Sequence, residues 1–197
     1  MRKIRNMIGS MKQQIVISGV GGQGVLFVTR LLAEAAIMRG FSVFTSETHG
    51  MAQRGGTVLS HLKVGNFSSP LIRPANADGL LALKAGGLSQ HGFYLKPDAW
   101  AAVNRREAVV QDSESPVFAV DADGLAQRIH QPKSVNLILL GFTVGVVSKA
   151  LENRLFCSFE DLKAVLEKQL AGKKKMLGDA ITALETGFNE FERLNLG

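Results

Sequence analysis

The sequence contains a single cysteine, Cys157, among its 197 residues. One cysteine cannot form an internal disulfide, and an iron–sulfur cluster requires about four thiolates. The four histidines also lack the paired helical spacing of a zinc-binding motif: His49, His61, His91 and His130. We therefore expect the chain to hold no metal and no redox centre by itself.

Long apolar runs and a secretory leader are also missing. The longest apolar stretch, 135–147, is interrupted by Gly141 and Gly145 and is shorter than the ~18 residues that cross a bilayer. The first twelve residues are charged and contain no apolar core of a signal peptide. These absences predict a cytoplasmic protein without membrane contact. We expect a weakly ordered extension, residues 1–12, followed by one domain, residues 13–197.

The net charge of +6 is spread along the chain, and 173–175 is its only run of lysines. Basic residues are not interleaved with aromatic ones, as a surface that stacks nucleic-acid bases requires, so we expect no nucleic-acid partner. The charge itself keeps a nucleotide-sensing or nucleic-acid-binding module open as an alternative.

A glycine-rich turn follows the first apolar segment. Residues 14–18 predict a buried strand, and the next residues have the pattern G-x-G-x-x-G before a helix that begins at Val25 and ends near Gly40. Glycine at these positions lets backbone N–H groups at a helix N-terminus face phosphate oxygens. The residues of this candidate anion-binding turn are Gly19, Gly21, Gly22, Gln23 and Gly24.

A second strand, predicted over 41–46, leads to an acidic residue and a polar loop. Glu47 stands near the position of a ribose ligand in dinucleotide-binding folds, so a stand-alone NAD- or FAD-binding Rossmann oxidoreductase is one alternative. The loop 48–56 contains almost nothing apolar and cannot be core. Its residues that could face a ligand or a partner are Thr48, His49, Gln53, Arg54, Gly55 and Gly56.

Two motifs carry a resemblance to a known family. The segments VGGQGV at 20–25 and ETHGMAQRGG at 47–56 resemble the gamma-type subunit or domain of 2-oxoacid:ferredoxin oxidoreductases, in particular the small (beta) subunit of indolepyruvate:ferredoxin oxidoreductase. The likeness extends from about residue 14 through the C-terminal helices. Asn136 adds to it.

The resemblance implies a subunit that positions ligands and does not react with them. Complexes of this family oxidise 2-oxoacids such as indolepyruvate, pyruvate or 2-oxoglutarate with coenzyme A, and pass the electrons to ferredoxin. Thiamine diphosphate and the iron–sulfur clusters are implied on the larger partner subunits. This chain is then expected to contain no catalytic residue, to contact coenzyme A and partner through the two motifs, and to be inactive alone. When isolated, it could self-associate as a homodimer.

The rest of the chain continues an α/β pattern. Asp121 and Ser158 have the character of helix N-caps, and Gly141 with Gly145 predicts a close helix contact. We expect a single doubly wound, Rossmann-like domain with a mostly parallel sheet and a helical C-terminus. The predicted elements are strands at 57–64, 77–83, 99–103 and 117–120, a turn at 96–98, and helices at 87–92, 121–130 and 134–150, with two more after Ser158 and Gly172.

Overall fold

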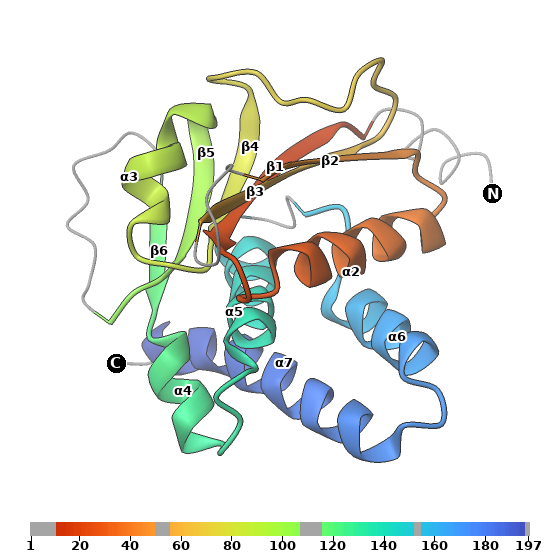
Figure 1. Ribbon diagram of the computed structural model, residues 1–197, viewed down its shortest axis with the longest axis vertical. Coiled ribbons are helices and arrows are strands. Elements are labelled where there is room, and N and C mark those ends of the chain that lie inside the picture. Colours follow the sequence, from red (N-terminus) through yellow and green to blue (C-terminus); the bar gives the residue numbers. More distant parts are fainter. Residues whose placement is uncertain (1–10, 50–55, 107–115, 152–154, 196–197) are drawn as a thin grey trace.

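In the computed structural model, the chain forms a six-stranded sheet with helices on both faces (Figure 1). The structure describes residues 11–49, 56–106, 116–151 and 155–195. The strands are β1 (Gln13–Val20), β2 (Val43–His49), β3 (Thr57–Val64), β4 (Ala77–Ala82), β5 (Leu95–Asn104) and β6 (Val117–Val120). The helices are α2 (Val25–Met38), α3 (Gly87–His91), the 3₁₀ turn η1 (Gly92–Tyr94), α4 (Ala122–Arg128), α5 (Val135–Ala150), α6 (Phe159–Gln169) and α7 (Lys174–Asn195).

The strand order is β2-β3-β1-β4-β5-β6. The pairs β1/β4, β4/β5 and β5/β6 are parallel, whereas β3 is antiparallel to both of its neighbours, β1 and β2. In the register, Ser60 of β3 lies between Ile17 of β1 and Glu47 of β2. The expected α/β fold with a helical C-terminus is confirmed, in a mixed sheet.

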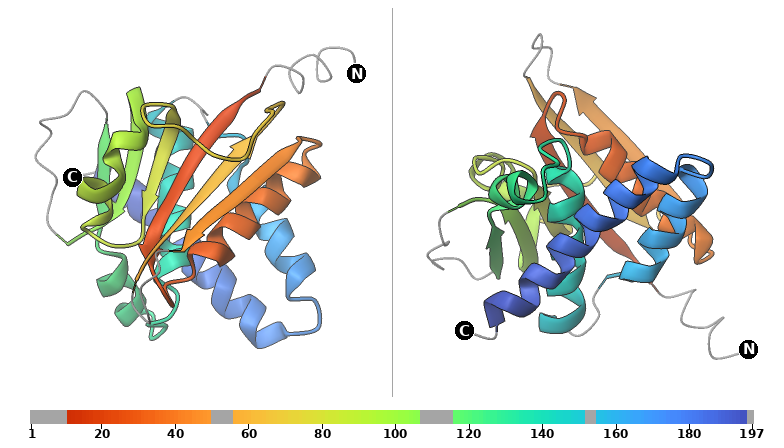
Figure 2. Two further views of the ribbon diagram at one scale, coloured as in Figure 1. Left: turned by 45° about the horizontal axis from the view of Figure 1, so that its top comes forward. Right: turned by 90° about the horizontal axis from the view of Figure 1, so that it is seen from below.

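The two faces of the sheet are covered unequally. Helices α2, α4, α5, α6 and α7 cover one face and enclose the larger hydrophobic core, which includes Ile17, Leu62 and Phe142. The short helix α3 and the segment 66–76 lie on the other face, over a smaller core that contains Val16 and Ile72 (Figure 2). The strands β1 and β4 are buried from both sides, which explains the continuous apolar runs 15–17 in β1 and 80–82 in β4.

Helices α4 and α6 begin at the N-caps expected from the sequence. The carboxylate of Asp121 accepts a 2.8 Å hydrogen bond from Gly124 N, and Ser158 forms a reciprocal capping box with Asp161. Each cap satisfies backbone N–H groups that the first helical turn leaves free.

Helices α5 and α7 cross in close contact. A Cβ atom at Gly141 would collide with the carbonyl oxygen of Leu184, and one at Gly187 would collide with that of Ile138. The predicted close contact is confirmed, and it lies within the domain. No helix of the described residues is long and apolar enough to span a membrane.

Two predicted local structures differ from those observed. Strand β2 runs to His49, so Thr48 and the backbone of His49 belong to a strand. Residues 96–98, expected as a turn, lie inside β5, where the β4 pairing shifts from Ala77/Leu95 to Gly79/Trp100. Asp98 adopts a positive φ of 61° there. The turn-forming residues therefore make an irregularity within the strand, and β5 continues past it.

Candidate functional site

The glycine-rich turn between β1 and α2 has the backbone conformation that its sequence requires. Gly22 and Gly24 have φ angles of 91° and 80°, which side chains rarely tolerate. A Cβ at Gly19 would lie 2.8 Å from Val25 Cγ2. The side chain of Gln23 closes the turn, because its Oε1 accepts a 2.9 Å hydrogen bond from Val20 N.

The N-terminus of α2 is left open at this turn. Its N-cap residue, Gly24, provides no side-chain cap, in contrast to Asp121 and Ser158 at α4 and α6. The amide of Asn136, in the first turn of α5, lies directly against Gly24, where a Cβ would collide with its Nδ2. At α5 the N-cap Ser134 makes no capping bond, but Asn136 Oδ1 accepts a 2.8 Å hydrogen bond from Leu137 N in the first turn. The N-termini of α2 and α5 therefore approach each other beside the glycine turn, and that of α2 has no capping side chain.

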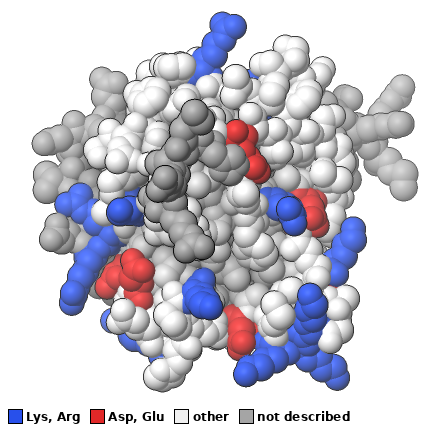
Figure 3. All heavy atoms as spheres, viewed as in Figure 1, with Lys and Arg blue, Asp and Glu red and all other residues white. Residues whose placement is uncertain are grey.

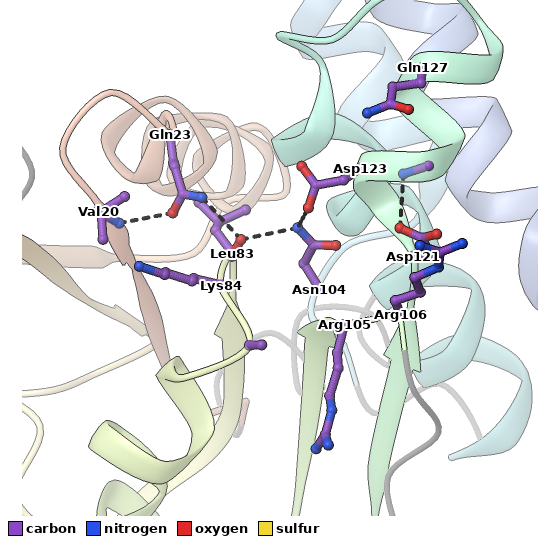
Figure 4. Close-up of a pocket in the computed structure, with 12 residues that line it drawn as sticks. Val20, Gln23, Leu83, Lys84, Asn104, Arg105, Arg106, Asp121, Asp123 and Gln127 are labelled. Atoms are coloured by element: carbon purple, nitrogen blue, oxygen red, sulfur yellow. Dashed lines mark hydrogen bonds between the residues drawn. The ribbon is translucent and has the colours of Figure 1, made fainter.

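A cavity of about 640 Å³ lies at the carboxyl ends of the parallel strands (Figure 4). From β1 the chain passes through α2 to β2 and β3, which lie on one side of β1 in the sheet, whereas β4, β5 and β6 lie on the other side. The strand order therefore reverses at β1, and the cavity occupies this point. Open α/β sheets bind ligands at such points. Its lining residues come from four segments: Val20, Gln23, Leu83, Lys84, Ala85, Asn104, Arg105, Arg106, Asp121, Asp123, Gly124 and Gln127.

Amide side chains hold the walls of this cavity together. Gln23 Nε2 and Asn104 Nδ2 both donate to the carbonyl oxygen of Leu83, at 3.3 and 3.2 Å. Asn104 also donates to Asp123 Oδ2 at 2.7 Å, and its Oδ1 accepts from Ala122 N at 3.0 Å. Asn104 is 5% exposed, and its polar atoms are satisfied. This network fixes the ends of β4 and β5 and the start of α4 relative to the glycine turn.

Three basic and two acidic side chains line the cavity. In Figure 4, Lys84 extends from the end of β4 toward Val20 of the glycine turn, whereas Arg105 points away from the amide network. Both carboxylates are engaged locally, Asp121 as the cap of α4 and Asp123 with Asn104. The exposed ammonium of Lys84 beside an uncapped helix is suited to bind an anion.

The structure brings part of the two sequence motifs together. Gly21 N donates to Gly56 O at 3.1 Å, so the end of the polar loop touches the glycine turn.

Glu47 and Thr48 are exposed on β2, and β3 separates them from β1. In a dinucleotide-binding fold the corresponding strand neighbours β1, so Glu47 does not occupy the usual position of a ribose ligand. The side chain of His49 and residues 50–55, which include Gln53, Arg54 and Gly55, lie outside the described residues.

Sequence reasoning did not identify the residues after β4 and β5. Asn104 is the last residue of β5, and Lys84 and Arg105 follow the ends of β4 and β5; this position at the carboxyl ends of parallel strands was the signal that could have found them. The predicted cap Asp121 also lines the cavity, together with Asp123 in the first turn of α4. Asn136 was noted only for the resemblance, whereas the structure places it against Gly24.

Cys157, His61 and His91 are not among the residues that line this cavity. Burial raises the pKa of the Cys157 thiol, which keeps it protonated and unreactive. His91 contacts Ser18, with 2.8 Å between Nδ1 and Oγ, and His61 Nδ1 accepts from Ile72 N at 3.3 Å. Burial lowers the pKa of both imidazoles. Among the described residues, no three His, Cys, Asp or Glu side chains are grouped to hold a metal.

Comparisons with known proteins cover nearly the whole chain. The indolepyruvate oxidoreductase subunit IorB of Archaeoglobus fulgidus is 27% identical over 200 residues, which cover 91% of this chain and 96% of the relative. The gamma subunit of keto/oxoacid ferredoxin oxidoreductase from Geobacter sulfurreducens has the same fold, with a TM-score of 0.72 at 21% identity, covering 92% of this chain and 99% of that one.

A larger protein contains the same fold as one of its parts. The 2-oxoglutarate:ferredoxin oxidoreductase from Magnetococcus marinus, solved with 2-oxoglutarate, coenzyme A and succinyl-CoA bound, matches with a TM-score of 0.70 at 23% identity, covering 92% of this chain and 31% of that one. Residues 14–190 match the family model of pyruvate ferredoxin/flavodoxin oxidoreductase. These findings confirm the resemblance to gamma-type subunits. The chain belongs to the pyruvate ferredoxin/flavodoxin oxidoreductase family.

Proposed function

We propose that this chain is the small subunit of a 2-oxoacid:ferredoxin oxidoreductase, and that it binds coenzyme A and closes the site where the 2-oxoacid is decarboxylated. Thiamine diphosphate and iron–sulfur clusters belong to the larger partner subunits, which also reduce ferredoxin. The substrate class is a 2-oxoacid of the indolepyruvate, pyruvate or 2-oxoglutarate type.

One observation carries this proposal: the uncapped N-terminus of α2 opens beside a cavity that Lys84 and Arg106 line. Coenzyme A carries several phosphate groups, which are the ligands that an open helix N-terminus and nearby ammonium or guanidinium groups bind. The cavity volume of about 640 Å³ lies within the range of ligand sites. The coenzyme A in the Magnetococcus marinus relative supports the same ligand.

The described cavity residues position a ligand but offer no covalent chemistry. No serine, cysteine or histidine is among the residues that line the cavity, and the carboxylates of Asp121 and Asp123 already accept hydrogen bonds. The described lining therefore lacks a hydroxyl or thiol nucleophile with a histidine as its general base. Acyl transfer to the thiol of coenzyme A then requires the partner subunit, and the chain alone is expected to be inactive.

The loop 48–56 is proposed to meet the partner and the substrate. Strand β2 ends at His49, and β3 begins after Gly56, beside the glycine turn. Both ends of the loop therefore lie at the same end of the sheet as the cavity. Gln53 and Arg54 carry the amide and guanidinium donors suited to a carboxylate or a phosphate.

The decisive experiment is anaerobic affinity capture of the tagged chain from its own cells. The captured material is assayed for 2-oxoacid-dependent dye reduction, with and without coenzyme A, across a panel of 2-oxoacids. Co-purification of a larger thiamine diphosphate and iron–sulfur protein, with activity that needs coenzyme A, is the expected result. A chain that is recovered alone, and whose preparation reduces no dye, would contradict the proposal.

A further inference from the structure

The sheet face opposite the main helical layer contains a surface unlike the rest of the molecule. In Figure 2, left, β1, β2 and β3 face the viewer, and among the described residues the segment 65–76 is the one that crosses them. In the view of Figure 1, which includes both the sheet and the helical layer, basic and acidic side chains are interspersed (Figure 3). The uncovered side gathers basic and apolar residues, which we call the basic face: Lys12, Phe44, Lys63, Phe67, Leu71 and Arg73.

Two lysines of the basic face converge on one aromatic ring. The Nζ atoms of Lys63 and Lys12 lie 5.0 and 5.4 Å from the ring centroid of Phe67. Lys63 is only 7% exposed. Burial and the charge of Arg73 lower the pKa of Lys63. Arg73 therefore acts on Lys63, and Lys12 shares the same aromatic ring.

None of these three cations has a carboxylate partner among the described residues. Some basic side chains elsewhere do have carboxylate partners: Arg39 with Asp161, Lys96 with Asp78 and Arg128 with Glu190. A lysine as buried as Lys63 normally has an anionic partner. The aromatic face of Phe67 attracts the ammonium groups but does not neutralise them. The basic face thus has a deficit of negative charge.

Exposed apolar side chains lie beside this charge. Phe44 is 38% exposed and pairs with Lys63 across the β2/β3 ladder. Leu71 is 54% exposed and precedes Ile72, whose N–H binds His61 on β3. Aromatic and aliphatic contacts surrounded by charge are typical of protein interfaces, whereas a small anion needs no apolar surface.

We infer that the basic face is a docking surface for a protein partner that presents aspartate or glutamate side chains around an apolar centre. The surface lies at the amino end of β1, and the glycine turn and cavity lie at its carboxyl end. A partner can therefore occupy the basic face while the cavity holds a ligand. The inference does not depend on the reaction that the partner catalyses.

The test uses zero-length carbodiimide cross-linking, which joins an ammonium group to a carboxylate in direct contact. The tagged full-length chain is captured from its own cells, cross-linked and analysed by mass spectrometry. We expect the exposed Lys12 to be linked to an acidic residue of a second polypeptide. In the double variant Lys12→Glu/Arg73→Glu, both sites of which are exposed, recovery of that polypeptide should fall about tenfold. The matched control is Lys168→Glu, on the exposed side of α6, with recovery unchanged.

Several results would overturn the inference. The first is a set of cross-links at other lysines only, and the second is full recovery of the partner with the double variant. The third is a chain that is captured alone. The fourth is displacement of the partner by inorganic phosphate at constant ionic strength, which would indicate a small-anion site. Dye reduction measured on the same preparation tests the proposed function separately. A cross-linked partner without 2-oxoacid activity would support the docking surface and contradict the proposed function.

Discussion

Gln23 and Asn104 donate hydrogen bonds to the same atom, the carbonyl oxygen of Leu83, at 3.3 and 3.2 Å. Gln23 comes from the turn after β1 and Asn104 from the end of β5, and Leu83 follows β4 between them. A carbonyl oxygen has two lone pairs, so one acceptor can bind both amides. The walls of the cavity are therefore joined at one atom.

Replacing Asn104 should destabilise the fold and the cavity together. Asn104→Ala removes the bonds to Leu83 and Asp123 and leaves the buried N–H of Ala122 without its acceptor. We expect a loss of about 2 to 3 kcal/mol in the free energy of unfolding, measured by urea titration. The control Gln90→Ala removes an exposed amide from α3 and should change stability by less than about 0.5 kcal/mol.

Gly24 should tolerate alanine much less well than Gly40. Both residues have positive φ, 80° and 84°, so each substitution carries a backbone cost of about 1 to 2 kcal/mol. Gly40 has open space around it, whereas a Cβ at Gly24 collides with Asn136. We expect about 1 to 3 kcal/mol more destabilisation for Gly24→Ala, from thermal or urea unfolding. The double variant Gly24→Ala/Asn136→Ala should recover part of this difference, and equal effects at both glycines would contradict the contact.

Stability should fall as the pH drops below about 6.5. Burial lowers the pKa of folded His61, with smaller effects from Lys63 and His91, and its Nδ1 must stay unprotonated to accept from Ile72 N. The unfolded state therefore binds more protons, so this stability is fully present above the unfolded pKa of 6.5 and is lost as pH falls toward the folded value.

The measurement is the urea concentration at the midpoint of unfolding, determined at several pH values from about 7.5 down to about 5. Carboxylates titrate mostly below this range. His61→Gln should flatten the dependence, and the exposed His130→Asn should leave it unchanged. The same slope in wild type and His61→Gln would assign the effect to other groups, among them His91, whose pKa is also lowered by burial.

Lys84 should contribute to coenzyme A affinity. If its ammonium binds a phosphate group, Lys84→Met removes a charge-assisted hydrogen bond and should raise the KM for coenzyme A about tenfold, with kcat nearly unchanged. The assay is dye reduction by the assembled complex. Lys168→Met, on α6 and outside the cavity, is the matched control. An unchanged KM would remove Lys84 from the ligand site.

Arg54 is expected to matter for turnover. Arg54→Ala should lower the turnover of the assembled enzyme by more than about tenfold without unfolding the chain, because a guanidinium fork at a ligand or partner is hard to replace. Circular dichroism checks the fold, and steady-state kinetics measures the effect. Wild-type turnover in this variant would show that Arg54 takes no part in the site.

Much of the local structure followed from short-range patterns. Apolar periodicity predicted the helices, and the caps Asp121 and Ser158 were correctly identified because capping depends on residues only three positions apart. The glycines of the turn were identified because positive φ is a property of the residue itself. The turn expected at 96–98 was wrong, because pairing with β4 retains that segment in β5.

The sequence by itself determined the strand, glycine turn and helix at the amino end, the α/β class and the family, since these depend on neighbouring residues. Only the tertiary structure decided that β3 separates Glu47 from β1, and that Lys84, Asn104 and Asp121 meet at one cavity. The tertiary structure also brought Lys12, Lys63 and Arg73 together on the sheet face opposite the main helical layer. These groups come from strands and loops far apart in the chain, and strand order, which long-range packing sets, brings them together.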